Sequence, residues 1–385
     1  MDGVSLPQGF GAHIANIGIK DDTDDFTVVA SDRPCTSAAV FTRSLFSGPS
    51  VVLSRRNAQR RSLRAAVVIS KNANVATGDE GRANAEEVAA SVAGSLGIEA
   101  GDVLLASTGV IGRRYPMDRV RSHLATFGGP LGSTDARAVA TAIMTTDTHP
   151  KVAVASAGEA RVVGVAKGVG MIEPDMATMI ALLFTDAEVS ADDLDAAFRR
   201  VVDRTFNSVS IDTDTSTSDT AAVIANGAAG PVDLAELEQA LGEVCLDLTR
   251  QIAADGEGAT RLLVVTVDGA RDEAQAKRVA KAIVNSPLVK TAVHGADPNW
   301  GRVAMAIGKC HDDTDIDQEQ VAIRFGDQEV YPSLVDDDGL AALSTTMKGE
   351  EVRIGATLGT GSASWTVYGC DLSDGYVRIN ADYTT

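Results

Sequence analysis

Thr178 stands between Ala177 and Met179, where the glycine-rich stretch KGVGMIEPDMATM (167–179) gives way to an apolar run. A threonine hydroxyl is a poor nucleophile unless a base accepts its proton. One such base is the residue's own α-amine, once the chain has been cut before it. That amine titrates near ~8 and is partly neutral at physiological pH. A cut between Ala177 and Thr178 would therefore make Thr178 a self-sufficient nucleophile. A threonine that caps a helix or ends a strand gives the same local pattern.

Thr108 and Gly109 follow an apolar run, DVLLAS (102–107), that is typical of a strand. A Thr-Gly turn at this place offers a hydroxyl and backbone N–H groups to one point. Donors of this kind stabilise the oxyanion of acyl transfer. A simple turn at the end of a strand has the same spacing.

Several blocks of the chain resemble the ornithine acetyltransferase (glutamate N-acetyltransferase) family, the self-processing type named arginine biosynthesis bifunctional protein. They run from end to end in that family's order, and the likeness is closest to its shorter members from clavam antibiotic clusters. Besides the segment around Thr178, the blocks are NANVATG (72–78), ASTGVIG (106–112), TTDT (145–148), DTDTSTSDT (212–220), DGEGAT (255–260), HGADPNWGRVAMAIG (294–308) and VRINADYTT (377–385).

The resemblance assigns a role to each matching residue. It makes Thr178 the nucleophile, cleaved from Ala177, and it places the oxyanion hole at Thr108 and Gly109. The substrate-binding residues that it implies are Thr145, Lys167, Thr178, Glu257, Asn380 and Thr385. From the residues alone, Lys167 is equally a solvated lysine, Glu257 a loop acid and Thr385 part of a loose tail. Asp175 and Glu173 depart from the family pattern beside the predicted cut.

The activity implied by the resemblance is transfer of acetyl from N2-acetyl-L-ornithine to L-glutamate through an acetyl-Thr178 intermediate, with ping-pong kinetics. Ornithine leaves before glutamate enters. The fragments 1–177 (α) and 178–385 (β) are expected to stay associated, as α2β2. Direct use of acetyl-CoA, and the choice between arginine supply and an antibiotic pathway, stay open. Two alternatives remain: an N-terminal-Thr amidase or aminopeptidase, and an uncleaved amino-acid-binding protein.

The composition narrows the class of protein. With 53 acidic and 34 basic residues the formal net charge is -19, and no basic stripe occurs, which disfavours nucleic acid and anionic membranes as partners. No segment has the length or apolarity of a membrane span. The four cysteines form no CxxC pair and the five histidines no HxxxH pair, so neither a metal nor a cofactor is predicted. Scattered cysteines and an N-terminus without a signal pattern favour a cytoplasmic protein.

The elements that must position these residues alternate between strand and helix patterns, which predicts an α/β (α+β) fold. Helical spacing occurs near 83–95, 117–127, after Ser133 as a candidate N-cap, after the Ser190/Asp193 capping box, and at 233–254 and 272–284. Alternation typical of strands recurs at 321–325, 351–358, 364–372 and 375–383. The resemblance implies a layered α-β-β-α body of N-terminal-nucleophile-like character over 1–270 and a smaller C-terminal α+β domain over 271–385.

Overall fold

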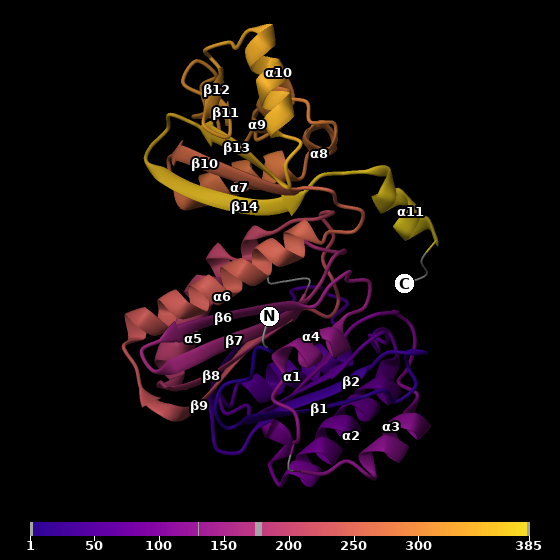
Figure 1. Ribbon diagram of the computed structural model, residues 1–385. Coiled ribbons are helices and arrows are strands. Elements are labelled where there is room, and N and C mark those ends of the chain that lie inside the picture. Colours follow the sequence, from indigo (N-terminus) through magenta and orange to yellow (C-terminus); the bar gives the residue numbers. More distant parts are fainter. Residues whose placement is uncertain (1–2, 130, 174–178, 383–385) are drawn as a thin grey trace.

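A computed structural model describes residues 3–129, 131–173 and 179–382. Its strands form three sheets, one of four strands and two of five. The chain begins in a layered lower body and ends in an upper lobe, and the last helix lies off to one side of both (Figure 1). Among the described residues no helix is both long and apolar enough to cross a membrane.

The first sheet carries Thr108 and Gly109 at the end of its edge strand. Its order is β1 (Phe10–Ala15), β2 (Phe26–Ser31), β4 (Ala65–Ile69) and β5 (Val103–Ser107), with β4 and β5 parallel. The helices α2 (Gly78–Leu96) and α3 (Met117–Leu124) share a buried apolar cluster with one face of this sheet. A short 3-10 helix, Ala100–Asp102, leads into β5.

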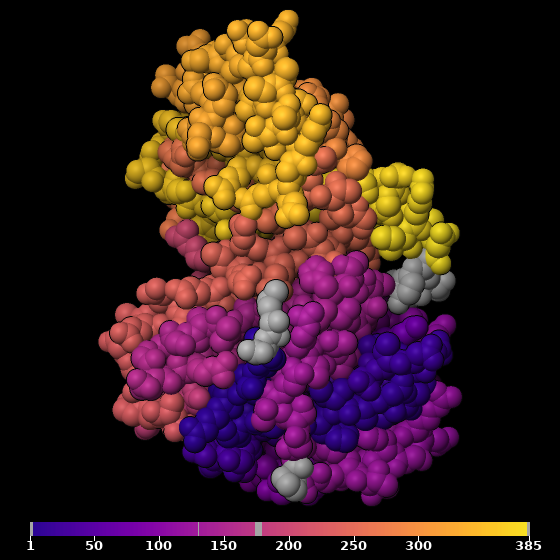
Figure 2. All heavy atoms as spheres, in the orientation of Figure 1, coloured from indigo at the N-terminus to yellow at the C-terminus, as the bar shows by residue number. Residues whose placement is uncertain are grey.

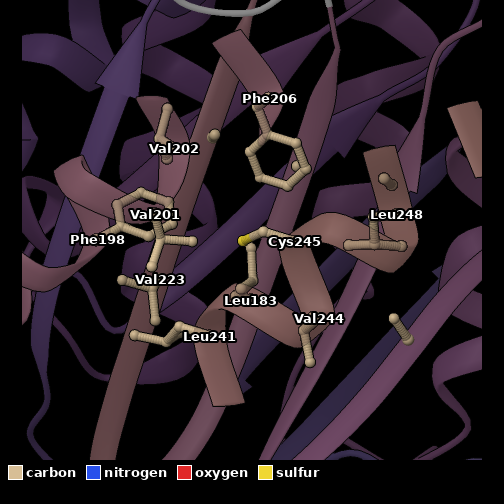
Figure 3. Close-up of a cluster of buried hydrophobic side chains, with 14 of the residues drawn as sticks. Leu183, Phe198, Val201, Val202, Phe206, Val223, Leu241, Val244, Cys245 and Leu248 are labelled. Atoms are coloured by element: carbon tan, nitrogen blue, oxygen red, sulfur yellow. The ribbon is translucent and has the colours of Figure 1, made fainter. Parts of the chain in front are cut away.

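The second sheet contains the strands on both sides of the predicted cut. Its order is β3 (Thr36–Phe41), β9 (Thr220–Pro231), β8 (Ile180–Glu188), β7 (Ala160–Lys167) and β6 (Lys151–Ala157). Its outer face packs on α5 (Ala191–Arg204) and α6 (Leu234–Ala254). Figure 3 shows this packing, in which Phe198 and Val202 of α5 and Leu241 and Leu248 of α6 face Leu183 and Val223 of the strands.

The two sheets face each other across a second apolar cluster, which joins Val68 and Leu104 of the first sheet to Val165 and Leu182 of the second. The helices α1 (Pro49–Ala58) and α4 (Ala136–Ile143) add side chains to the same cluster. Helices therefore cover the two outer faces of a pair of stacked sheets. The α/β fold class with a layered α-β-β-α body is confirmed.

The upper lobe is built on the third sheet. Its order is β12 (Gln328–Tyr331), β11 (Ala322–Phe325), β13 (Glu351–Thr357), β10 (Leu262–Ala270) and β14 (Ala363–Cys370). The helices of this region are α7 (Glu273–Val284), α8 (Pro287–His294), α9 (Trp300–Gly308) and α10 (Asp337–Thr346). A 3-10 turn, Phe206–Ser208, contacts this sheet, since Trp365 Nε1 of β14 donates to Ser208 Oγ at 2.8 Å. Because β10 belongs to this sheet, the residues of the lobe begin near 262; the division at 270/271 stays a prediction.

Two local expectations are corrected and a third is confirmed. The segment 375–383 was expected as a strand, but Asp374–Asp382 is the helix α11, with an Arg378–Asp374 ion pair of 2.7 Å one turn apart. Among the described residues no strand pairs with this segment, and Val377 is 64% exposed. The N-cap of α4 is Asp135, which accepts from Arg137 N–H at 2.8 Å, and not Ser133. The Ser190 cap of α5 is confirmed.

Candidate active site

Six of the residues singled out in the sequence line one cavity of about 110 Å³, although they come from five separate segments. They lie at the end of β5, after α4, at the end of β7, after α6 and on α11. These six are Thr108, Gly109, Thr145, Lys167, Glu257 and Asn380; the remaining lining residues are Ile111, Thr146, Gly170, Met171, Met179, Ile180 and 216–219. The cavity is thus a single polar site on the layered body.

The turn after β5 requires a glycine. Gly109 has φ +123°, and a Cβ there would lie 2.3 Å from the carbonyl carbon of Lys71. The neighbouring N–H groups are used within the fold, since Thr108 donates to Ile69 O at 3.1 Å and Val110 to Lys71 O at 3.3 Å. Among the described residues, the N–H of Gly109 meets no acceptor. This N–H, at the wall of the cavity, can donate to a bound oxyanion.

The ammonium of Lys167 lies 3.3 Å from Oγ1 of Thr108 and donates to it. An accepted hydrogen bond leaves the Thr108 hydroxyl proton for a second partner in the cavity. Burial lowers the pKa of Lys167, the carboxylates of Asp147, Glu257 and Asp219 oppose the shift, and Lys151 adds to it. The cavity therefore holds a buried lysine whose charge depends on its acidic neighbours.

Glu257 brings a carboxylate to the opposite wall. Its Oε1 accepts from the Thr146 hydroxyl at 3.2 Å, and its Oε2 accepts from Asn380 Nδ2 at 2.9 Å. A Cβ on Gly170 would stand 2.5 Å from this carboxylate, so a side chain there would displace the Glu257 carboxylate from its present position. Lys167 and Glu257 thus present opposite charges to one small space, as an amino acid with its carboxylate and ammonium requires.

Thr145 is held through its backbone. Its N–H donates to Oδ2 of Asp147 at 3.0 Å, while Oδ1 of Asp147 accepts from the Gly168 N–H at 2.7 Å. Although burial opposes it, the ammonium groups of Lys167 and Lys151 lower the pKa of Asp147 to about 2. Asp147 is therefore a carboxylate at every physiological pH.

Three predicted residues, Ala177, Thr178 and Thr385, lie outside the described residues. Met179, next in the chain to Thr178, lines the cavity. Glu173, before the undescribed stretch, accepts from Asn285 Nδ2 at 2.6 Å and from Ser210 Oγ at 3.3 Å. The roles of all the predicted site residues stay predictions.

Sequence reasoning missed several cavity neighbours. Asp147 stands in the TTDT block and Asp219 in DTDTSTSDT, but only Thr145 was singled out there; Asp219 is 1% exposed and lines the cavity. Their burial becomes visible only when the segments are brought together. Within the described ranges no group of three or more His, Cys, Asp or Glu side chains is arranged to hold a metal ion.

Comparison with known proteins finds the family that these sequence blocks resemble. Residues 11–385 match the ArgJ family. "Glutamate N-acetyltransferase Oat2" of Streptomyces clavuligerus is 58% identical over 385 residues, 98% of each chain. "Arginine biosynthesis bifunctional protein ArgJ" of Rhodococcoides fascians is 57% identical, over 98% of this chain and 94% of its own. A crystal structure of the ArgJ protein of Bacillus halodurans is 39% identical over 51% of this chain and 96% of its own, with a TM-score of 0.49.

A layered α/β body with a polar, oppositely charged cavity, together with relatives named for acetyl transfer, defines an enzyme of the acyltransferase class. The family match covers nearly the whole chain. The protein belongs to the ArgJ family.

Proposed function

We propose that this protein transfers the acetyl group of N2-acetyl-L-ornithine to L-glutamate, after autoproteolysis between Ala177 and Thr178. The observation that carries the proposal is the convergence of Thr108, Gly109, Lys167 and Glu257 on one cavity that Met179 also lines. The full-length likeness to a relative named glutamate N-acetyltransferase supports the same reaction.

The chemistry is acyl transfer in two halves. The hydroxyl of Thr178 attacks the acetyl carbonyl and gives its proton to the freed α-amine of the same residue. The oxyanion accepts hydrogen bonds from the Thr108 hydroxyl and the Gly109 N–H. The amide bond breaks, the proton passes to the leaving amine, and ornithine departs. The amine of glutamate then attacks the acetyl-Thr178 ester and restores the hydroxyl.

The charged walls suit the charged groups of the substrates. Lys167 is placed to bind the α-carboxylate that acetylornithine and glutamate share, and Glu257 to bind the side-chain ammonium of acetylornithine. Thr145, Asn380 and Thr385 complete the proposed contacts. Because acetylornithine and glutamate occupy the site in turn, the proposal needs no separate acceptor pocket and no cofactor.

The pairing of β7 with β8 supports lasting association of the α (1–177) and β (178–385) fragments. Lys167 lies opposite Ile180 in this antiparallel pair, and β3 pairs with β9 across the same cut. Separating the fragments would break two of the four strand pairings in this sheet, β3 with β9 and β7 with β8, and expose its buried face. We further propose assembly as α2β2 in the cytoplasm and a role in arginine biosynthesis; an antibiotic pathway is the competing placement.

Intact mass spectrometry tests the cut, and trapping with acetylornithine alone tests the acyl intermediate. The wild type should give two fragments, with acetyl on the one that begins at Thr178, whereas Thr178→Ala should stay whole and inactive. Net hydrolysis without transfer to glutamate would instead indicate an amidase. A single uncleaved wild-type band would indicate a binding protein. If the gene restores growth of an arginine auxotroph without added arginine, the role in arginine biosynthesis is supported. If it does not, the antibiotic pathway is favoured.

A further inference from the structure

Three buried charged side chains form a chain behind the cavity. The ammonium of Lys151 lies 2.8 Å from Oδ1 of Asp147 and 2.5 Å from Oδ2 of Asp255. The side chains of Lys151 and Asp147 are 0% exposed, and that of Asp255 is 3% exposed. Removing three charges from water is costly, and apolar side chains in their place are often as stable or more so. Stability alone is therefore a weak reason for this arrangement.

Each carboxylate also holds the backbone of a segment that lines the cavity. Asp147 accepts from the N–H groups of Thr145 and Gly168, the latter next to Lys167. Asp255, two residues before Glu257, accepts from the Thr148 N–H at 3.1 Å. Lys151 on β6 lies between the two acids. The chain of charges therefore ties together the three segments that carry Thr145, Lys167 and Glu257.

Charged side chains from five segments of the chain act on Lys167. Asp147 faces it from the turn after α4, Lys151 from β6, Glu257 from the loop after α6 and Asp219 from the start of β9, and Lys20 acts on it from the loop after β1. Of the acids, Asp147 has the largest effect, and Lys151 is the strongest opposing cation. Burial is the largest cause that lowers the pKa of Lys167, and among its charged neighbours Asp147 and Lys151 have the largest, opposite effects.

We propose that Asp147 is a positioning residue that keeps Lys167 protonated and in place for the carboxylate of the bound amino acid, and that the ammonium of Lys151, paired with Asp147 and Asp255, limits this effect of Asp147. The part that concerns the bound amino acid rests on the proposed function. The part that concerns Lys167 does not, because its protonation is measurable without turnover.

Two substitutions shift the balance in opposite directions. Asp147→Asn keeps the shape but removes the negative charge, so Lys167 should lose its proton at a lower pH. Lys151→Met removes the opposing cation, and Asp255→Asn added to it avoids an unpaired buried acid. This double variant should make Lys167 lose its proton at a higher pH. Each variant removes a charge that acts on the Lys167 ammonium, so shifts of about one pH unit in its titration midpoint are expected.

The titration midpoint of Lys167, the pH at which half of these side chains have lost their proton, is measured by NMR of protein labelled with 13C at lysine Cε. The Lys167 signal is assigned through Lys167→Met. The matched control is Asp186→Asn. Asp186 is also a buried acid on the second sheet, and it accepts from the N–H groups of Gln8 and Arg161 at 3.1 and 2.7 Å, but it does not line the cavity. The alkaline limb of kcat/KM for acetylornithine is followed in the same variants.

The proposal is supported if the titration midpoint of Lys167 is lowered in Asp147→Asn, raised in the double variant and unchanged in Asp186→Asn. An unchanged midpoint in either test variant overturns it. If Asp147→Asn does not fold, the double variant still decides. A wild type that never transfers acetyl refutes the proposed function and leaves the NMR result standing. If the alkaline limb of the kcat/KM profile moves together with the titration midpoint of Lys167, Lys167 takes part in substrate binding. If the limb does not move, that role is contradicted.

Discussion

Asn380 on α11 donates a hydrogen bond of 2.9 Å to Oε2 of Glu257, across 123 residues of sequence. The contact anchors an outlying helix, visible at the side of the molecule in Figure 2, to a residue that lines the cavity. A hydrogen bond to a charged group contributes about 1.5–3 kcal/mol. Asn380→Ala should therefore raise KM for acetylornithine by roughly tenfold or more.

The control for this prediction is Arg378→Ala on the same helix. Arg378 pairs with Asp374 at the surface, and exposed pairs of this kind contribute little. Steady-state kinetics and thermal unfolding of both variants check the prediction. Equal rises in KM would mean that α11 as a whole, and not the contact with Glu257, matters.

Gly109 is expected to tolerate no side chain. Its φ of +123° and the approach of the Lys71 backbone within 2.3 Å of an added Cβ force the turn to move in Gly109→Ala. Because the Gly109 N–H is the proposed oxyanion donor, kcat should fall by about 10²–10³. Single-turnover acetylation of the enzyme measures this step directly.

Gly112→Ala provides the matched control, since Gly112 also has a positive φ, +83°, but an added Cβ there meets nothing within 4 Å. It should cost about 1 kcal/mol of stability through left-handed strain alone, with kcat near that of the wild type. Similar kcat losses in the two variants would show that the turn responds to strain and not to displacement of the donor.

The local sequence patterns predicted the helices and strands better than they predicted which of them lie in contact. Leu237, Leu241, Cys245, Leu248 and Ile252 of the 233–254 stripe are buried as the helical period requires, because α6 has a sheet below it. Leu234 of the same stripe is 37% exposed, since it begins the helix beyond that contact.

The contacts within the site join residues far apart in the sequence, and no local pattern indicates them. Nothing near Asp255 or Lys151 indicates that these residues, 104 apart, share a buried ion pair. Likewise the alternation in 375–383 suggested a strand, although a strand requires a neighbouring strand and α11 has none among the described residues. The resemblance supplied the site residues; their common cavity appears only in three dimensions.

A histidine pair predicts acid sensitivity of the first layer. Nε2 of His13 on β1 lies 3.0 Å from Nε2 of His123 on α3, among Phe26 and Phe127. Burial lowers the pKa of both rings; the charge of His123 lowers that of His13 further, while Asp25 opposes the shift in His123. The unfolded chain therefore binds more protons, and stability is lost as pH falls below about 6.5.

Urea unfolding at pH 7.5 and 5.5 tests this expectation. His123→Gln retains a hydrogen-bond partner for His13 but cannot gain a charge, so its unfolding free energy should depend less on pH than that of the wild type. His311→Gln, at a side chain that is 86% exposed, should behave as the wild type does. The same pH dependence in all three proteins would contradict a role for the pair.

Gly258 fixes the position of α11, and with it that of Asn380. Gly258 has φ +71°, and an added Cβ would lie 2.2 Å from the backbone nitrogen of Tyr376 at the start of the helix. Gly258→Ala should displace α11 and raise KM for acetylornithine at least as much as Asn380→Ala. Adding Asn380→Ala to it should then change KM little, because the contact with Glu257 is already lost.

Gly326→Ala separates displacement from backbone strain. Gly326, in the hairpin between β11 and β12, has a similar φ of +58°, but nothing lies within 4 Å of an added Cβ. Both alanine variants should lose about 1 kcal/mol of stability, and KM should rise only for Gly258→Ala. If the double variant instead multiplies the two separate rises in KM, the two residues act independently, and Gly258 does not work through Asn380.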